Sequence, residues 1–328
     1  MSGKSEFGPH VLDLPDPEAA IEQIASGMKS AARDFRRKGG VVGISGGIDS
    51  SVVAALAARA FGPGKVLGVL MPETDSSEDT LALSRLAADS AGIDTVLENI
   101  TPILEGAGAY RRRDEAFKRV IPEYGPGWKA KLVLPSVIES ENYRIFSVVA
   151  EAPDGRVVKE RLPLQEYLQV VAATNFKQRT RKMMEYYHAD RLNYLVLGTP
   201  NRLEYDQGFF VKNGDGSADV KPIAHLYKSQ VYQLAEALGV PEEIRSRPPT
   251  TDTYSMPQSQ EEFYFSLPYD RMDLCLYAVD NGVGAAEVAD ALELTEDQVQ
   301  RVFADIASKR RMSRYLHATP KLLTDAVA

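Results

Sequence analysis

The stretch Gly40-Val41-Val42-Gly43-Ile44-Ser45-Gly46-Gly47-Ile48-Asp49-Ser50-Ser51 decides the fold. Its apolar residues 41–44 predict a short buried strand, and the alanine-rich residues 50–61 have a helical pattern. The turn between them carries two glycines, which let the backbone approach an anion closely, and amide groups at the helix start point toward that anion. The stretch therefore predicts a phosphate-binding turn, with a tight serine-capped turn as the alternative.

The segments on either side of this stretch alternate between strands and helices. On the amino-terminal side, Asp16 can cap a helix that starts at Pro17 and ends near residues 39–40. The other expected elements are strands at residues 66–71, 95–97 and 194–198, and helices at residues 77–91, 164–189 and 228–238. This alternation predicts an α/β fold, a doubly wound parallel sheet with helices on both faces.

Two segments depart from the alternation. Residues 122–163 hold two strand-like runs, 143–150 and 156–162, around the turn signal Asp154-Gly155, and they predict an inserted β-hairpin. Residues 267–328 predict a helical carboxyl-terminal extension, with helical patterns at 270–279, 285–292 and 296–306 and a partly ordered tail after Arg314. We expect one domain over residues 1–328, with the long loop at residues 247–268 either functional or mobile.

The composition excludes several classes of protein. The chain has 328 residues, with 38 Lys and Arg against 46 Asp and Glu, and its net charge of −8 argues against a nucleic-acid partner. No apolar run approaches the ~20 residues of a membrane span, so we expect a cytoplasmic protein with no membrane partner. The single cysteine, Cys275, lies in an apolar helical stripe and is expected to be a core residue.

Residues 285–299 could also be interpreted as a helix-turn-helix. A DNA-reading helix needs basic or amide side chains that face the groove, whereas Glu296 and Asp297 would repel phosphate. We therefore interpret these residues as two packing helices.

The expected phosphate-binding turn contains an acidic residue, Asp49, and no lysine, so it is not the phosphate loop of a Walker-type NTPase. Asp49 would repel phosphate unless a cation such as Mg²⁺ lay between them. Residues 199–204 follow another expected strand. Because ligands bind at the carboxyl ends of parallel strands, residues 45–51 and 199–204 should lie at the same face of the sheet.

The pattern Ser-Gly-Gly-x-Asp-Ser after an apolar strand resembles the pyrophosphate loop of ATP pyrophosphatases, the PP-loop group. Four further blocks follow in order, at residues 175–181, 197–204, 208–219 and 222–232. Together the five blocks resemble the ammonia-dependent NAD synthetases. The resemblance implies an adenine nucleotide alpha hydrolase-like fold and a C–N ligase that adenylates the carboxylate of deamido-NAD with ATP. Ammonia then gives NAD, with AMP and pyrophosphate as the other products.

The resemblance also implies residue roles. ATP would be held by Gly43, Ile44, Ser45, Gly46, Gly47, Ile48, Asp49, Ser50, Thr199, Lys228 and Thr250. Asp49 and Glu204 would bind Mg²⁺, Asp49 and Lys228 would carry the catalysis, and deamido-NAD would be held by Arg179, Lys212 and Asp219. Without the motif, Arg179, Arg181 and Lys182 would be interpreted as a solvated helix face. The family also implies a homodimer.

Departures from the family pattern mark a divergent member. Residues 122–163 form an insertion that ordinary family members are not expected to have, and residues 251–262 differ from the residues that the family usually has there. An amide synthetase for another carboxylate or amine is therefore the alternative. A non-catalytic nucleotide-binding protein is a third hypothesis, opposed by the intact set of Asp49, Glu204 and Lys228. Because Cys275 is not expected to be a nucleophile, ammonia should arrive free or from a separate glutaminase.

Overall fold

A parallel sheet forms the centre of the molecule. The computed structural model describes residues 7–77, 79–134, 146–250, 253–265 and 267–323. The sheet has the order β3-β2-β1-β7, with strands β1 (Gly40–Gly43), β2 (Val66–Leu70), β3 (Asp94–Leu97) and β7 (Leu195–Leu197), all paired in parallel. The residues of β2 and β7 are all buried, as expected for strands covered on both faces. The predicted doubly wound sheet is confirmed.

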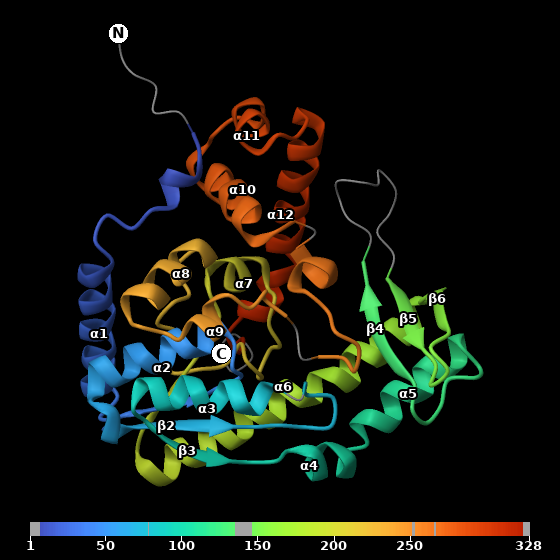
Figure 1. The fold of residues 1–328 in the computed structure, drawn as a ribbon, viewed down its shortest axis with the longest axis horizontal. Coiled ribbons are helices and arrows are strands. Elements are labelled where there is room, and N and C mark those ends of the chain that lie inside the picture. The colour runs from blue at the N-terminus through green and yellow to red at the C-terminus, as the bar shows by residue number, and fades with distance from the viewer. Residues whose placement is uncertain (1–6, 78, 135–145, 251–252, 266, 324–328) are drawn as a thin grey trace.

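Helices cover both faces of this sheet (Figure 1). One face packs against α1 (Pro17–Asp34), α2 (Ile48–Phe61), α3 (Thr80–Ala91) and α8 (Lys228–Ala237). The other face packs against α4 (Thr101–Gly106), the start of α5 (Ala109–Val120) and α6 (Leu164–Leu192). Alternate side chains of β1 explain the two layers, because Val42 packs with the apolar side chains on the α2 face and Val41 with those on the α6 face.

The first helix illustrates how local sequence sets an element's ends. Asp16 caps α1 as predicted, since its carboxylate accepts a 3.0 Å hydrogen bond from the Ala19 amide. The helix ends at Asp34 and not near residues 39–40 as expected. Arg36 takes a left-handed backbone conformation with φ 54°, which stops the helical hydrogen bonds before the glycines are reached.

The strand order places the site. β1 pairs with β2 on one side and with β7 on the other. The chain therefore adds β2 and β3 on one side of β1 and later adds β7 on the other side. Crevices form where the order of the strands changes direction in this way, at the carboxyl ends of the strands. The segments that follow β1 and β7 therefore meet at one edge of the sheet, as the sequence predicted. Short helices α7 (Arg202–Gln207) and α9 (Glu242–Arg245) lie on this side.

The insertion is a three-stranded antiparallel sheet beside α5 and α6 (Figure 1). Its strands are β4 (Lys129–Val133), β5 (Ser147–Glu151) and β6 (Val157–Arg161), in the order β4-β5-β6. The predicted hairpin is confirmed as β5 and β6, although the expected residues 143–145 lie outside the described residues. β4 was not predicted, because no turn signal like Asp154-Gly155 joins it to another strand-like run and its two lysines weaken the strand pattern.

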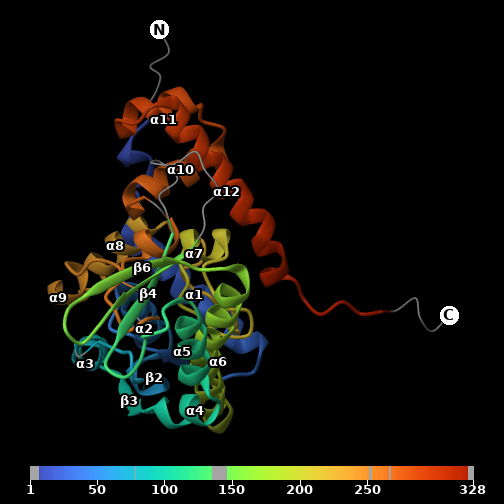
Figure 2. The ribbon, with the colours of Figure 1, turned by 90° about the vertical axis from the view of Figure 1, so that its right-hand side faces the viewer.

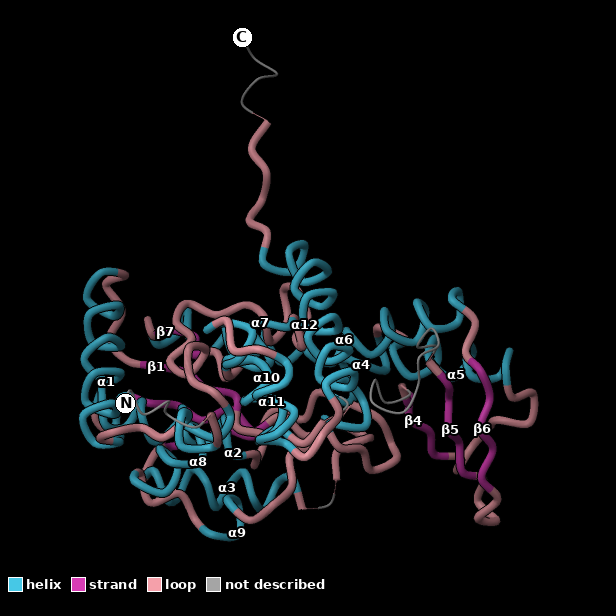
Figure 3. Tube along the Cα trace, turned by 90° about the horizontal axis from the view of Figure 1, so that it is seen from above, coloured by secondary structure: helices cyan, strands magenta, loops and turns pink. Residues whose placement is uncertain are grey.

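The carboxyl-terminal helices form a second core. α10 (Tyr269–Asn281), α11 (Ala285–Leu292) and α12 (Glu296–His317) pack together with the 3₁₀ turn at Pro9–Leu12. Cys275 is fully buried there, and burial raises the pKa of its thiol to about 12, so its predicted core position is confirmed. α12 continues to His317, and the described chain after it runs away from the body of the molecule (Figures 2 and 3).

Short turns complete the described chain, with 3₁₀ helices at Pro9–Leu12 and Pro63–Lys65 and a π turn at Glu261–Phe265. No helix among the described residues combines the length and the apolar character that crossing a membrane requires.

A buried carboxylate joins the two cores. Asp273 of α10 is fully buried, and its Oδ2 accepts hydrogen bonds of 2.7 Å from both the amide and the hydroxyl of Ser229 in the first turn of α8. Its other oxygen has no hydrogen-bond partner among the described residues. Burial raises the pKa of Asp273 to about 6. The extension thus caps the helix that begins with Lys228.

We predict that Asp273→Asn raises the free energy of unfolding at pH 7 by about 1 kcal/mol. Asn keeps one acceptor for Ser229 and removes a buried charge. The pKa of Asp273 is higher in the folded chain, so its contribution to wild-type stability is complete below pH ~4 and is lost as the pH rises through about 6. Urea unfolding at pH 4, 5.5 and 7 should show the gap widen with pH.

The exposed Asp270 on the same helix supplies the control, and Asp270→Asn should show no such widening. A variant at Asp273 that is less stable than wild type at every pH would contradict this account.

Candidate active site

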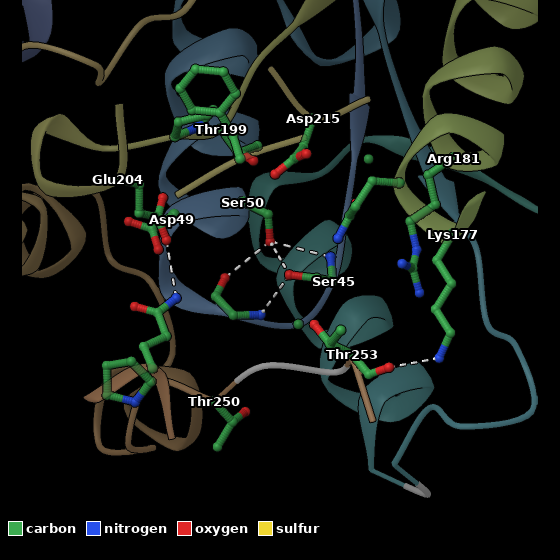
Figure 4. Close-up of a pocket in the computed structure, with 18 of the residues that line it drawn as sticks. Ser45, Asp49, Ser50, Lys177, Arg181, Thr199, Glu204, Asp215, Thr250 and Thr253 are labelled. Carbon is green, nitrogen blue, oxygen red and sulfur yellow. Dashed lines mark hydrogen bonds between the residues drawn. The ribbon is translucent and has the colours of Figure 1, made fainter. Parts of the chain in front are cut away.

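A cavity of about 460 Å³ opens at the carboxyl ends of β1 and β7. It is lined by every residue that the sequence assigned to ATP and to metal: Gly43, Ile44, Ser45, Gly46, Gly47, Ile48, Asp49, Ser50, Thr199, Glu204, Lys228 and Thr250. Figure 4 shows Ser45, Ser50, Asp49 and Glu204 around this space, with Thr199 and Thr250 on either side. The structure brings together residues from Gly43 to Thr250, which lie far apart in the sequence, while their roles stay predictions.

Serine hydroxyls hold the turn between β1 and α2 in shape. The Ser50 hydroxyl donates to the Gly47 carbonyl at 3.0 Å and accepts from the Ser45 amide at 3.2 Å. Gly47 is the N-cap residue of α2 and offers no side-chain cap, so the amides of the first helical turn are left for a ligand. Such amides and the positive end of the helix dipole favour an anion. The geometry agrees with the predicted phosphate-binding turn.

Gly46 is required by conformation and by space. Its φ is +77°, a left-handed conformation that side chains rarely adopt, and an added Cβ would lie 2.8 Å from the Cβ of Leu83 in α3. The turn therefore passes directly over α3, and only glycine fits there.

Three charged side chains meet beside this turn, one from each of three helices. Lys228, at the start of α8, is 2% exposed and forms an ion pair with Asp49 of α2. Glu204 of α7 completes the group. Burial and the negative charge of Asp49 raise the pKa of Glu204 to about 8. Burial by itself would lower the pKa of Lys228, but the charges of Asp49 and Glu204 outweigh it and raise that pKa.

Asn201 connects the two carboxylates. The side-chain NH₂ group of Asn201 donates to the Asp49 carboxylate at 3.2 Å, and its side-chain oxygen accepts from the Glu204 backbone amide at 3.1 Å. Glu204 in turn accepts from the Asn201 amide at 3.2 Å, so the pair forms a capping box at the start of α7. Asn201 lies in the motif block 197–204 but is not among the predicted site residues. Its spacing from Glu204 is the signal that could have included it.

The donor set fits a cation that is shared with phosphate. No group of three or more His, Cys, Asp or Glu side chains that could hold a metal occurs among the described residues. Mg²⁺ commonly takes one or two carboxylates and completes its shell with substrate phosphates and water. After burial, the negative charge of Asp49 is the largest cause that raises the pKa of Glu204, and a cation beside the two carboxylates would offset it.

Basic residues of α6 form the opposite wall. The ammonium group of Lys177 is buried and donates to Glu73 at 2.9 Å, to Asp75 at 2.7 Å and to the Thr253 carbonyl at 2.8 Å. Lys182 is also buried, 2.6 Å from Glu185, and Arg181 lines the cavity. The solvated helix face expected from the residues alone is therefore wrong for Lys182. Its partner lies one turn away on the buried side of the helix.

The three residues predicted to hold deamido-NAD do not line the cavity. Arg179 is exposed, and its Nε donates to the Lys212 carbonyl at 3.3 Å. The Lys212 ammonium group donates to the carbonyls of Tyr315 and Ala318 at 2.7 and 3.0 Å. Asp219 is exposed and accepts from the Val196 amide at 2.7 Å. Their assignment stays a prediction about the surface next to the cavity.

The sequence did not assign several other residues that line the cavity. Asp215, whose pKa is raised by burial, is one of them and lies near Ser50 and Thr199 (Figure 4). The others are aromatic side chains of the insertion, α6, the segment after α7 and the loop after α9. These are Phe146, Tyr167, Phe209, Phe263 and Tyr264. Phe146 stacks on Tyr167 with ring centres 4.4 Å apart. The cavity thus has a polar end at the turn and an aromatic end under the insertion.

Comparisons with known proteins agree on one family. The NAD synthase family model matches residues 20–120 and 130–316. The NH(3)-dependent NAD(+) synthetase of Rhizobium meliloti (strain 1021) is 58% identical over 308 residues, which cover 94% of this chain and 92% of that protein. The protein of the same name from Mesorhizobium japonicum is 60% identical over 308 residues, 94% of this chain and 97% of that protein.

A solved structure supports the fold. The NMN synthetase of Francisella tularensis matches with a TM-score of 0.67 at 20% identity, and the match covers 95% of this chain and 100% of that one.

We predict that Gly46→Ala lowers the affinity for ATP at least about tenfold, because the left-handed conformation and the contact with α3 force the turn to move. Calorimetric titration with ATP measures the change. Gly64→Ala is the control, since its Cβ would meet nothing within 4 Å and its φ is not positive. Equal ATP affinity of Gly46→Ala and wild type would remove this turn from the binding site.

Proposed function

The chain belongs to the NAD synthase family, and we propose that it is an ammonia-dependent NAD synthetase, an ATP-consuming ligase that forms a C–N bond. The observation that carries the proposal is the meeting of Asp49, Glu204 and Lys228 beside an uncapped helix start at the sheet's crevice. That arrangement suits a triphosphate whose leaving pyrophosphate has to be stabilised. The high sequence identity to proteins named NH(3)-dependent NAD(+) synthetase supports deamido-NAD as the carboxylate that is adenylated.

The reaction proceeds in two displacements. A carboxylate oxygen of nicotinic acid adenine dinucleotide attacks the α-phosphorus of ATP, and the bond from that phosphorus to the α,β-bridging oxygen breaks, which releases pyrophosphate. Ammonia then attacks the carbonyl carbon of the adenylate. AMP leaves with the electron pair of the C–O bond, and nitrogen loses a proton to give the amide.

The residues of this chain act by position and charge. The amides at the start of α2 are placed to hold phosphate oxygens, and the Ser45 and Ser50 hydroxyls keep the turn rigid. Lys228 offers a buried positive charge toward the phosphate chain. Asp49 pairs with its ammonium group, and Asn201 holds Asp49 in place through a hydrogen bond. A prearranged charge of this kind lowers the barrier because it needs no reorganisation during the reaction.

Magnesium belongs to the proposal as well. Asp49 and Glu204 are the residues that would hold it, and when bound it supplies charge neutralisation for the leaving pyrophosphate. Arg179, Lys212 and Asp219 are kept as the proposed contacts of deamido-NAD on the adjacent surface.

The source of ammonia follows from Cys275. Its thiol is fully buried with a raised pKa, so it is unsuited to hydrolyse glutamine. We propose that ammonia is taken up free or from a separate glutaminase. We also propose a homodimer and a cytoplasmic location.

The insertion does not favour a different acceptor. The 308 aligned residues of this 328-residue chain leave too few positions unmatched to omit the whole of residues 122–163. The segment therefore does not separate the chain from the two synthetases compared above, and the alternative of another carboxylate or amine loses its main support.

The test is an assay of the purified protein with ATP, Mg²⁺, ammonium and nicotinic acid adenine dinucleotide, with controls that omit each component. NAD and pyrophosphate should appear in equal amounts and only in the complete mixture. Pyrophosphate release that needs a different carboxylate, with no NAD formed, would overturn the proposed acceptor.

We predict that Asp49→Asn reduces pyrophosphate release by at least about 100-fold, because it removes the proposed metal ligand and the partner of Lys228. The fold should persist, since Glu204 still compensates the buried ammonium group. Circular dichroism checks the fold. Asp290→Asn, at an exposed position of α11, is the control and should retain full turnover. Unchanged turnover of Asp49→Asn would remove Asp49 from the site.

A further inference from the structure

The loop between α9 and α10 covers one side of the cavity. Thr250, Thr253 and Gln260 of this loop all line it. The described part of the loop has little regular structure, with a single bridge between Thr250 and Ser259 and the π turn at Glu261–Phe265. Its position therefore has to be set by contacts with other parts of the molecule.

The inserted sheet supplies those contacts through the free edge of β4. β4 pairs with β5 on one side only, so the backbone groups on its other side are open to pairing. The loop takes them: the Ala130 amide donates to the Ser255 hydroxyl at 3.0 Å, and the Met256 amide donates to the Ala130 carbonyl at 3.3 Å. The Gln258 side chain donates to the Leu132 carbonyl.

Side chains strengthen the same junction. The Lys131 ammonium group lies 2.8 Å from the Glu262 carboxylate and 3.3 Å from the Pro257 carbonyl. Tyr254 is 3% exposed and joins the apolar cluster of the insertion, against which Phe263 also packs. The loop is thus attached to β4 by hydrogen bonds, by an ion pair and by apolar contacts.

Gln260 extends from this attached loop to the charged end of the cavity. Its side-chain amide donates to Oε1 of Glu204 at 3.0 Å, and its backbone amide donates to the Pro249 carbonyl at 3.3 Å. The other oxygen of Glu204 accepts from Asn201. Each oxygen of this carboxylate therefore has one donor that fixes its direction, and neither donor adds charge.

We propose that Gln260 is a positioning residue for Glu204, and that the inserted sheet holds it there through the loop. The proposal rests on the proposed function, since Glu204 is one of the two carboxylates placed beside the phosphates of ATP. It gives the insertion a role in the reaction: β4 keeps in place a donor that the loop alone, with little regular structure, could not hold. In this proposal Gln260 acts on ATP and Mg²⁺ through its hydrogen bond to Glu204.

The test begins with Gln260→Met, which keeps the size of the side chain and removes the donor. Calorimetry measures the affinity for ATP in the presence of Mg²⁺, and the expected loss is about tenfold, the size of one hydrogen bond to a charged group. In the assay the KM for ATP should rise while the KM for deamido-NAD and the melting temperature stay unchanged. A loosened structure would instead lower the melting temperature and move both KM values.

Lys131→Met tests the role of the insertion, because Lys131 does not line the cavity. It should weaken ATP binding about twofold to threefold, in keeping with a partly exposed ion pair. If the insertion acts through Gln260, the double variant should bind ATP as tightly as Gln260→Met alone. The effects of two residues that act through the same contacts do not add. Gln300→Ala on the exposed side of α12 is the control.

Each outcome decides the proposal. Wild-type ATP affinity in Gln260→Met overturns it, and losses that multiply in the double variant overturn the part played by the insertion. Because calorimetry needs no turnover, a wild-type chain that made no NAD would refute the proposed function and leave the measurement on Gln260 still valid.

Discussion

The buried ammonium group of Lys228 is the interaction on which the site depends. It pairs with Asp49, and its charge offsets part of the repulsion between Asp49 and Glu204, two carboxylates that come from different helices. Without that positive charge, two anions would be held together in a poorly solvated place, at a cost of several kcal/mol. With it, the group of Asp49, Glu204 and Lys228 has one carboxylate more than it has cations, and a divalent ion that arrived with phosphate would favour the ionised form of Glu204.

The fold serves this charge arrangement by bringing its parts to one edge of the sheet. The first turn of α2 carries Asp49, α7 after β7 carries Glu204, and α8 presents Lys228 from its first turn. Asp273 fixes that first turn from the second core, and Asn201 links the two carboxylates. On the opposite side, the insertion sets the loop that carries Gln260. Elements far apart in the chain thus determine the geometry of three side chains.

The sequence was most informative where the deciding forces are local. The strand, turn and helix of residues 41–61 could be predicted because hydrophobic pattern and glycine placement act within a few residues. β4 could not, since its lysines suit an edge strand and no turn signal joins it to another strand-like run. Motif blocks identified Asp49, Glu204 and Lys228. Gln260 was missed because it meets Glu204 across 56 residues, through a loop whose position depends on the insertion. Lys182 was misjudged for a related reason, because its burial depends on how α6 packs.

The central claim is that this site transfers the adenylate of ATP to a carboxylate. The most direct measurement uses nicotinic acid adenine dinucleotide whose carboxylate is labelled with ¹⁸O, turned over with ATP and ammonium, with mass spectrometry of the products. The account predicts that one labelled oxygen appears in AMP and none in pyrophosphate, because the oxygen that attacks the α-phosphorus leaves with it. Label that appears in a phosphate released from the end of ATP, with unlabelled AMP or with ADP as the other product, would contradict it.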